Sequence, residues 1–216
     1  NNRGRTLRSL GKKEEAKNDF ITAIELCAKK IETNKDDYEL WYYRGWAEYK
    51  LEMFNEALID YNKAIELIDD KENYFVCRGE TRDVLKDYEG AIKDYTKAIE
   101  INPNVADFYH YRGRANIALK DYEGAIGDYT KAIEINPNNA KFFYNRGRIR
   151  SELKDYEGAI EDYTKAIEIN ANDAYFYYYR GRVRNELKCY EGAIEDYSRA
   201  TEINSNDAYF YDWRGW

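Results

Sequence analysis

The residues that could perform catalysis or hold a metal are few and scattered. The chain of 216 residues has one histidine, His110, and three cysteines, Cys27, Cys77 and Cys189. None of these cysteines has a second cysteine or a histidine at the spacing of metal ligands. The aspartates, glutamates and tyrosines recur with a fixed period, which indicates an architectural role. We therefore predict no catalytic residue, no metal site and no cofactor, so the chain is not expected to be an enzyme.

Arginine side chains offer a different chemistry, because a guanidinium group donates paired hydrogen bonds to a carboxylate. An Arg-Gly pair recurs every 34 residues, at Arg44-Gly45, Arg78-Gly79, Arg112-Gly113, Arg146-Gly147, Arg180-Gly181 and Arg214-Gly215. A second arginine follows the glycine at Arg114, Arg148 and Arg182. Further along each unit a phrase such as "DYEGAIGDYTKAIEINPN" returns. One structural unit has therefore been copied along the chain.

Each unit has two stretches with the hydrophobic periodicity of amphipathic helices. In the unit of residues 72–105, the first stripe contains Phe75, Thr81 and Leu85, and the second contains Tyr88, Ala91, Ile92, Tyr95, Ala98 and Ile99. Leu119 and Leu153 are expected to complete the first stripe in the next two units. A helical hairpin cannot bury both faces alone, so neighbouring units must stack into a solenoid. The glycine lies where the two helices cross closely.

The composition excludes several classes of protein. With a net charge of −7, the chain is not a nucleic-acid binder by bulk charge. No apolar run is long enough to span a membrane, and the amino-terminal residues lack the apolar core of a signal peptide. Three widely spaced cysteines favour a reducing compartment, so we expect a cytoplasmic protein.

The 34-residue period, the aromatic residue four before the glycine and the two Tyr-x-x-Ala spacings resemble the tetratricopeptide repeat. The resemblance implies an all-α, right-handed superhelical solenoid of antiparallel helix hairpins. Two positions depart from the family pattern. Arginine replaces the usual leucine before the glycine, and Glu48, Arg82, Asn116, Arg150 and Arg184 replace an aromatic residue.

The whole of 1–216 is expected to form one solenoid. Its predicted repeats are 1–37, 38–71, 72–105, 106–139, 140–173 and 174–207, with a truncated copy at 208–216. The first repeat is seven residues longer than the period, so its second helix should continue through about Thr33. By alignment to the other copies, the chain starts and stops inside a helix, and its only methionine, Met53, is internal. We expect a fragment of a longer array, with further domains outside it.

The arginine before each glycine lies on the buried stripe and therefore needs a partner. An aspartate follows 16 residues later in every full copy. We predict structural Arg-Asp pairs, either within a repeat or between neighbours; independent solvated charges are the alternative. The structural residues predicted in the last three full repeats are Arg112, Arg146, Arg180, Asp128, Asp162 and Asp196.

The arginine after each glycine lies on a second stripe, which varies from copy to copy. In tetratricopeptide arrays this face lines the concave groove that holds peptides or partner helices. The resemblance therefore implies a ligand groove formed by Arg114, Arg148, Arg182, Lys141, His110, Asn145, Tyr144 and Tyr178. Asn145 matches the asparagine of the family's carboxylate clamp, but His110, Arg114, Tyr175 and Tyr179 replace its other residues. The alternative is that these arginines are solvated and serve solubility.

These residues favour a non-catalytic scaffold that binds a peptide or partner segment, acidic in character, in the concave groove. We expect a protein or peptide partner, no nucleic acid and no membrane insertion. One alternative is a structural module that stacks end to end through Tyr209, Phe210, Tyr211, Trp213 and Trp216. Another is an accessory repeat region of a larger enzyme.

Overall fold

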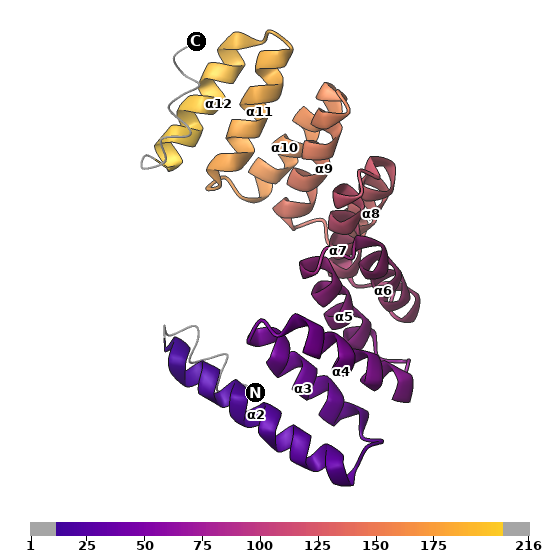
Figure 1. Ribbon diagram of the computed structural model, residues 1–216. Helices are drawn as coiled ribbons and strands as arrows, with labels where there is room; N and C mark the ends of the chain where they lie inside the picture. The colour runs from indigo at the N-terminus through magenta and orange to yellow at the C-terminus, as the bar shows by residue number, and fades with distance from the viewer. Residues whose placement is uncertain (1–11, 205–216) are drawn as a thin grey trace. The chain divides into compact units, whose positions relative to one another are not determined.

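The computed structural model describes residues 12–204, and this part of the chain contains eleven helices and no strand. The all-α class predicted from the periodicity is confirmed. The described residues divide into two compact units, 12–104 and 105–204, whose helices are labelled in Figure 1. The helices are α2 (Lys13–Thr33), α3 (Tyr38–Lys50), α4 (Phe54–Leu67), α5 (Glu72–Val84), α6 (Tyr88–Ile101), α7 (Ala106–Ala118), α8 (Tyr122–Ile135), α9 (Ala140–Glu152), α10 (Tyr156–Ile169), α11 (Ala174–Glu186) and α12 (Tyr190–Ile203).

The first unit contains α2 and two hairpins, α3 with α4 and α5 with α6. Helix α2 packs against α3, and α4 packs against α5. Helix α2 has 21 residues and ends at Thr33, whereas α4 and α6 have 14 residues each. This confirms the expectation that the seven additional residues lengthen one helix.

The second unit contains three hairpins, α7 with α8, α9 with α10 and α11 with α12, and α8 packs on α9 as α10 packs on α11. The core of this unit has the same types of side chain in each hairpin, because the alanines and the central tyrosine of each second helix are buried. Ala159 and Tyr163 of α10 pack in one cluster with Val183 of α11. The helices of one repeat are therefore held in place partly by the next repeat.

The turn within each hairpin explains the recurring Lys-Asp-Tyr-Glu-Gly phrase. Lys154 has a left-handed backbone with φ of 63°. This lets the N–H of Asp155 bond to the carbonyl of Arg150 at 2.8 Å, which closes the end of α9. The side chain of Asp155 then caps α10 by accepting from the N–H of Gly158. The short turn fixes how the two helices of the hairpin meet.

The glycine of each Arg-Gly pair marks the closest approach of the two helices. A Cβ atom added at Gly147 would lie 3.1 Å from Cβ of Asp162 and 3.1 Å from Cε1 of Tyr163. At Gly79 it would lie only 2.7 Å from Cε1 of Tyr95. The glycine is required because a side chain there would separate the helices, although glycine lowers helix stability.

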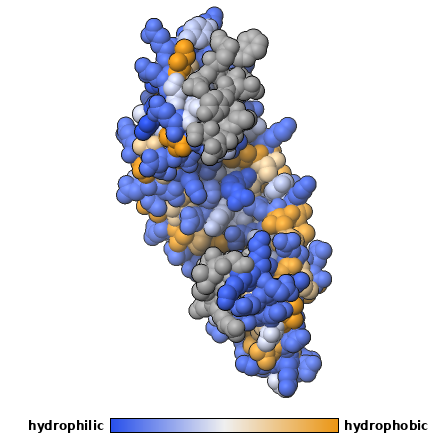
Figure 2. All heavy atoms as spheres, turned by 90° about the vertical axis from the view of Figure 1, so that its left-hand side faces the viewer, coloured by the Kyte–Doolittle hydropathy of each residue, from blue (hydrophilic) through white to orange (hydrophobic). Residues whose placement is uncertain are grey.

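One expectation about the packed stripe is wrong. Leu85, Leu119 and Leu153 are 37%, 44% and 48% exposed, respectively. Each is the C-cap residue directly after its helix, so its side chain leaves the stripe where the backbone turns. Hydrophilic side chains predominate on the face shown in Figure 2, and hydrophobic residues form scattered patches there. Among residues 12–204, no helix is both long and apolar enough to cross a membrane.

Candidate functional site

In the five Arg-Gly pairs that lie within residues 12–204, the arginine is paired with the aspartate of its own repeat. The Nε and Nη2 atoms of Arg146 donate to the two carboxylate oxygens of Asp162, at 3.0 and 2.7 Å. The same two-pronged pairing occurs at Arg44 with Asp60, Arg78 with Asp94, Arg112 with Asp128, and Arg180 with Asp196. The aspartates are buried. The pairs thus lie within a repeat, a choice that the spacing alone left open.

Residues at the second position that departs from the family pattern complete this network. The Nη1 atoms of Arg82, Arg150 and Arg184 donate to Asp94, Asp162 and Asp196, at 2.8, 3.1 and 2.9 Å. In the remaining repeat of the second unit, Nδ2 of Asn116 donates to Oδ2 of Asp128 at 2.9 Å. Burial, the largest effect, raises the pKa of Asp128, while Arg112 and Asn116 act in the opposite direction. In the three repeats with a second arginine, each buried carboxylate therefore accepts hydrogen bonds from two guanidinium groups.

Glu48 reverses the charge at this position in the first unit. It is buried beside Asp60, and its Oε1 atom lies 3.9 Å from Nε of Arg44. Burial and the negative charge of Asp60 raise the pKa of Glu48 to about 8. One arginine here faces two carboxyl groups, so the protonated form of Glu48 is favoured.

The third guanidinium nitrogen, Nη1, donates to a side chain of the preceding repeat of the same unit. The Nη1 atom of Arg146 donates to Oγ1 of Thr130 at 3.0 Å, and that of Arg180 donates to Oγ1 of Thr164 at 3.0 Å. In the first unit Arg78 donates to Asn62 at 2.8 Å. Each of the three guanidinium nitrogens of these arginines therefore already donates to a partner within the protein, which indicates a structural role.

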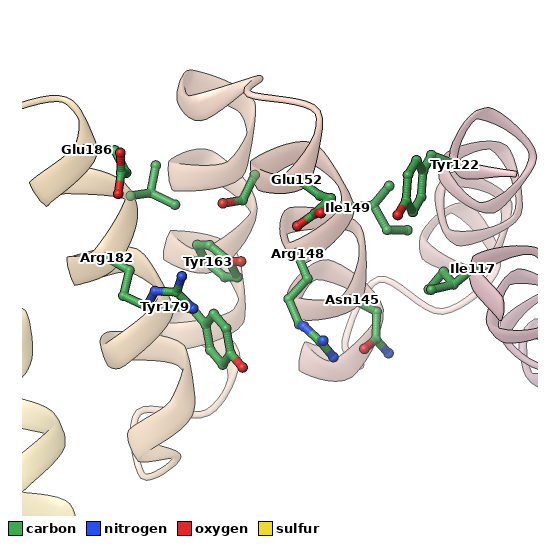
Figure 3. Close-up of a pocket in the computed structure, with 12 residues that line it drawn as sticks. Ile117, Tyr122, Asn145, Arg148, Ile149, Glu152, Tyr163, Tyr179, Arg182 and Glu186 are labelled. Atoms are coloured by element: carbon green, nitrogen blue, oxygen red, sulfur yellow. The ribbon is translucent and has the colours of Figure 1, made fainter. Parts of the chain in front are cut away.

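A pocket of about 290 Å³ lies in the second unit, mainly between α9 and α11 (Figure 3). Asn145 and Arg148 reach it from α9, and Tyr179 and Arg182 reach it from α11. It is lined by Ile117, Tyr122, Asn145, Arg148, Ile149, Ser151, Glu152, Tyr163, Tyr179, Arg182, Val183 and Glu186. Polar and apolar side chains both face this space, a mixture typical of ligand-binding pockets.

The two pocket arginines differ from the structural ones. Arg148 and Arg182 are exposed, and within residues 12–204 neither forms an ion pair. Their guanidinium groups lie 5.6 and 5.8 Å from the ring centroid of Tyr179, a cation–π arrangement on one shared ring. Tyr179 thus positions two charges that no carboxylate neutralises.

The pocket brings together three of the predicted groove residues, Asn145, Arg148 and Arg182. Tyr144 is half-buried and does not line this pocket, although its ring lies 5.7 Å from the guanidinium of Arg148. Arg114 and Lys141 are exposed but do not line this pocket.

The structure places the other two predicted groove residues differently. Tyr178 is 1% exposed and packs with Tyr197 of α12, so it belongs to the core. His110 is half-buried against Tyr129 and Phe142. Burial, with a smaller effect of Arg114, lowers the pKa of His110 to about 4, so the ring is neutral near pH 7.

Several pocket residues were missed by the sequence analysis. Glu152 and Glu186 lie five residues after their glycines, one position beyond the stripe used for the prediction. Tyr163 occupies the position of Tyr95, which was predicted to lie on a packed stripe; it is buried, but it also lines the pocket. The repetition of glutamate at the same position in two consecutive repeats was the available signal.

Other predicted features can be placed only in part. Cys27, Cys77 and Cys189 are free thiols. The described part of the chain has no group of three His, Cys, Asp or Glu side chains able to hold a metal ion. The aromatic residues Tyr209, Phe210, Tyr211, Trp213 and Trp216, proposed as a stacking surface, lie outside the described residues.

Family models of the tetratricopeptide repeat match several parts of the chain. Two models named tetratricopeptide repeat match residues 140–173 and 38–70, and a third matches residues 1–30. A model described as a TPR repeat matches 85–120 and 113–153. Together these matches cover more than half of the chain. The protein prenyltransferase alpha subunit repeat also matches, at residues 20–51.

Solved structures show the same fold. The structure of YrrB, described as a TPR protein with an unusual peptide-binding site, has a TM-score of 0.74 and 21% identity, covering 88% of this chain and 97% of that one. A MamA structure has a TM-score of 0.74 and 21% identity, covering 80% of this chain and 94% of that one. The C-terminal part of a TPR repeat-containing protein from Cytophaga hutchinsonii has a TM-score of 0.77 and 22% identity, covering 87% and 75%. The search of curated protein sequences gave no match.

Proposed function

Because the chain belongs to the tetratricopeptide repeat family, we propose that it is a non-catalytic scaffold that holds a peptide or partner segment in the groove of its second unit. The pocket between α9 and α11 is the proposed point of contact. Its ligand presents at least one carboxylate to Arg148 and Arg182.

The observation that carries this proposal is the contrast between two sets of arginines. Each of the three guanidinium nitrogens of Arg146 donates a hydrogen bond to Asp162 or Thr130. Arg148, two residues later, is exposed and lies over Tyr144 and Tyr179. A guanidinium held in place but without an anionic partner is prepared to bind one. The peptide-binding site ascribed to YrrB supports the same class of function, since that protein shares the fold.

The experiment is a selection from a phage-displayed library of random linear peptides on two immobilised proteins. One is the wild type, and the other has Arg114, Arg148 and Arg182 replaced by alanine. We expect peptides with at least one carboxylate side chain to be enriched on the wild type and lost on the variant, and their binding to weaken as salt rises, because exposed charges are screened.

A matched control removes three positive charges elsewhere. Lys97, Lys131 and Lys165 are exposed on the second helices, where each pairs with a glutamate three residues later. Replacing these lysines with alanine should leave the enriched peptides unchanged. The proposal fails if the arginine variant, folded by circular dichroism, enriches the same peptides as the wild type.

A further inference from the structure

The pocket in the second unit has two rows of opposite charge. Glu152 and Glu186 lie on one side of Arg148 and Arg182, and Asn145 and Tyr179 lie on the other (Figure 3). Each glutamate follows its arginine by four residues on the same helix, a separation of about 6 Å along the helix axis. The arginine row and the glutamate row therefore run side by side across α9 and α11.

The two rows do not neutralise each other. Within the described residues no ion pair joins Arg148 to Glu152 or Arg182 to Glu186, although the positions are one helical turn apart. An acidic residue placed before a basic one pairs better on a helix than the reverse order found here. Both guanidinium groups instead lie over Tyr179. Four charges thus remain available on the walls of one pocket.

The floor of the pocket adds a hydrogen-bonding group without a partner. Tyr163 is fully buried, and its hydroxyl has no hydrogen-bond partner among residues 12–204. The corresponding hydroxyl in the first unit, that of Tyr95, donates to Asp83 at 3.0 Å. Ser151 takes the place of Asp83 in this repeat and also lines the pocket. A buried hydroxyl without a partner is unfavourable, so an incoming acceptor at this position would be stabilised.

We infer that this pocket selects an ampholytic peptide segment, in which a carboxylate and an ammonium or guanidinium group lie about 6 Å apart, about one turn of a helix. The inference rests on the proposed function and specifies its ligand. The carboxylate accepts from Arg148, Arg182 and Asn145, and the cation contacts Glu152 and Glu186. Residues spaced four apart on a helical ligand meet this requirement.

Charge complementarity distinguishes this ligand from a purely acidic one. A segment with two adjacent carboxylates would place the second one beside Glu152 or Glu186, which is repulsive. A phosphate group has the same disadvantage. The volume of about 290 Å³ accommodates a few side chains, so the ligand is a short segment.

The experiment repeats the peptide selection with charge-neutral variants of each row. The first variant is Glu152→Gln with Glu186→Gln, and the second is Arg148→Gln with Arg182→Gln. We expect the wild type to enrich peptides that have an acidic and a basic residue three or four positions apart. The glutamine-for-glutamate variant should enrich acidic peptides without the basic residue, and the glutamine-for-arginine variant should enrich basic ones.

A synthetic fluorescent copy of one enriched peptide then gives the magnitude by anisotropy. Glu152→Gln with Glu186→Gln should weaken its binding about fivefold, near the upper limit for exposed ion pairs. Glu134→Gln with Glu168→Gln removes two exposed glutamates from the second helices and should leave binding unchanged.

The outcomes separate this inference from the proposed function. If the wild type enriches purely acidic peptides, and the loss of Glu152 and Glu186 leaves their binding equal or tighter, the ampholytic inference is wrong while the groove function stands. If the wild type enriches no peptide above an unrelated immobilised protein, the proposed function itself fails.

Discussion

Arg146 binds Asp162 through two hydrogen bonds, from Nε to Oδ2 at 3.0 Å and from Nη2 to Oδ1 at 2.7 Å. Both side chains are largely shielded from water. Without Arg146, the buried carboxylate of Asp162 would keep only Arg150 as a cation, through one hydrogen bond of 3.1 Å. Removing one partner of such a buried pair is therefore strongly destabilising, even though the intact pair contributes little net free energy to folding.

The first prediction compares neighbouring arginines. Arg146→Ala should lower the free energy of unfolding by about 3 to 5 kcal/mol, because Asp162 loses its main partner. Arg148→Ala, on the exposed face, should change it by no more than about 0.5 kcal/mol. Urea denaturation followed by circular dichroism measures both. Equal, small effects would contradict the assignment of the two arginines to different faces.

The second prediction concerns the repeat in which asparagine replaces the second cation. Asn116→Arg should stabilise the protein by about 1 kcal/mol at pH 7, since the new guanidinium can donate to Asp128 as Arg150 does to Asp162. Burial raises the pKa of Asp128, so the gain should disappear as the pH falls through that pKa and the carboxylate becomes neutral.

The reciprocal change is its control. Arg150→Asn should destabilise the next repeat by about 1 to 2 kcal/mol. A gain from Asn116→Arg that persisted in strong acid would show that the effect is not an interaction with the carboxylate of Asp128.

The third prediction contrasts two helical glycines. Gly79→Ala should destabilise by about 1 to 3 kcal/mol, because its Cβ would lie 2.7 Å from Cε1 of Tyr95. Gly127→Ala should stabilise by about 0.5 to 1 kcal/mol, since no atom lies within 4 Å of the added Cβ and alanine favours the helix. Thermal and urea denaturation of the two variants should therefore shift in opposite directions.

The fourth prediction is a pH dependence from Glu48. Its folded pKa of about 8 lies above the usual value of 4.5, so the folded state binds the proton more tightly. Glu48 therefore makes the free energy of unfolding decrease as the pH rises from 4.5 toward 8. Glu48→Gln should remove this dependence and be more stable than the wild type by about 1 to 3 kcal/mol at pH 8.

Urea denaturation of wild type and variant at pH 5 and pH 8 tests this prediction. The difference between their free energies of unfolding isolates Glu48, because the other titrating groups are the same in both proteins. The two proteins should be similar in stability at pH 5. A constant difference between them at both pH values would show that the carboxyl of Glu48 does not titrate in this range.

Much of the fold followed from periodicity, and the reason is physical. The length of helix α2 and the formation of the hairpins depend on local residue spacing and on contacts repeated in every copy. The exposure of Leu119 and Leu153 did not follow, because it depends on where the backbone turns at the end of each helix.

The site was less accessible from sequence. The stripe that led to Arg148 and Arg182 also led to Tyr178, yet Tyr178 is covered through packing with α12. Tyr179 was set aside because it replaces a basic residue of the family's clamp, whereas its ring supports both pocket arginines. Which of two adjacent tyrosines faces the groove is decided by the packing of the following helix, which a single stripe does not describe.

The contact of Arg146 with Thr130 has a consequence for how such an array can change its length. Within the second unit, Arg146 and Arg180 each use an aspartate of their own repeat and a threonine of the repeat before it. An inserted copy of the repeat at 140–173 would bring its own aspartate for its arginine and its own threonine for the arginine that follows. Gene duplication or deletion of that whole repeat would therefore leave no buried charge without a partner, so the array can evolve by modular growth.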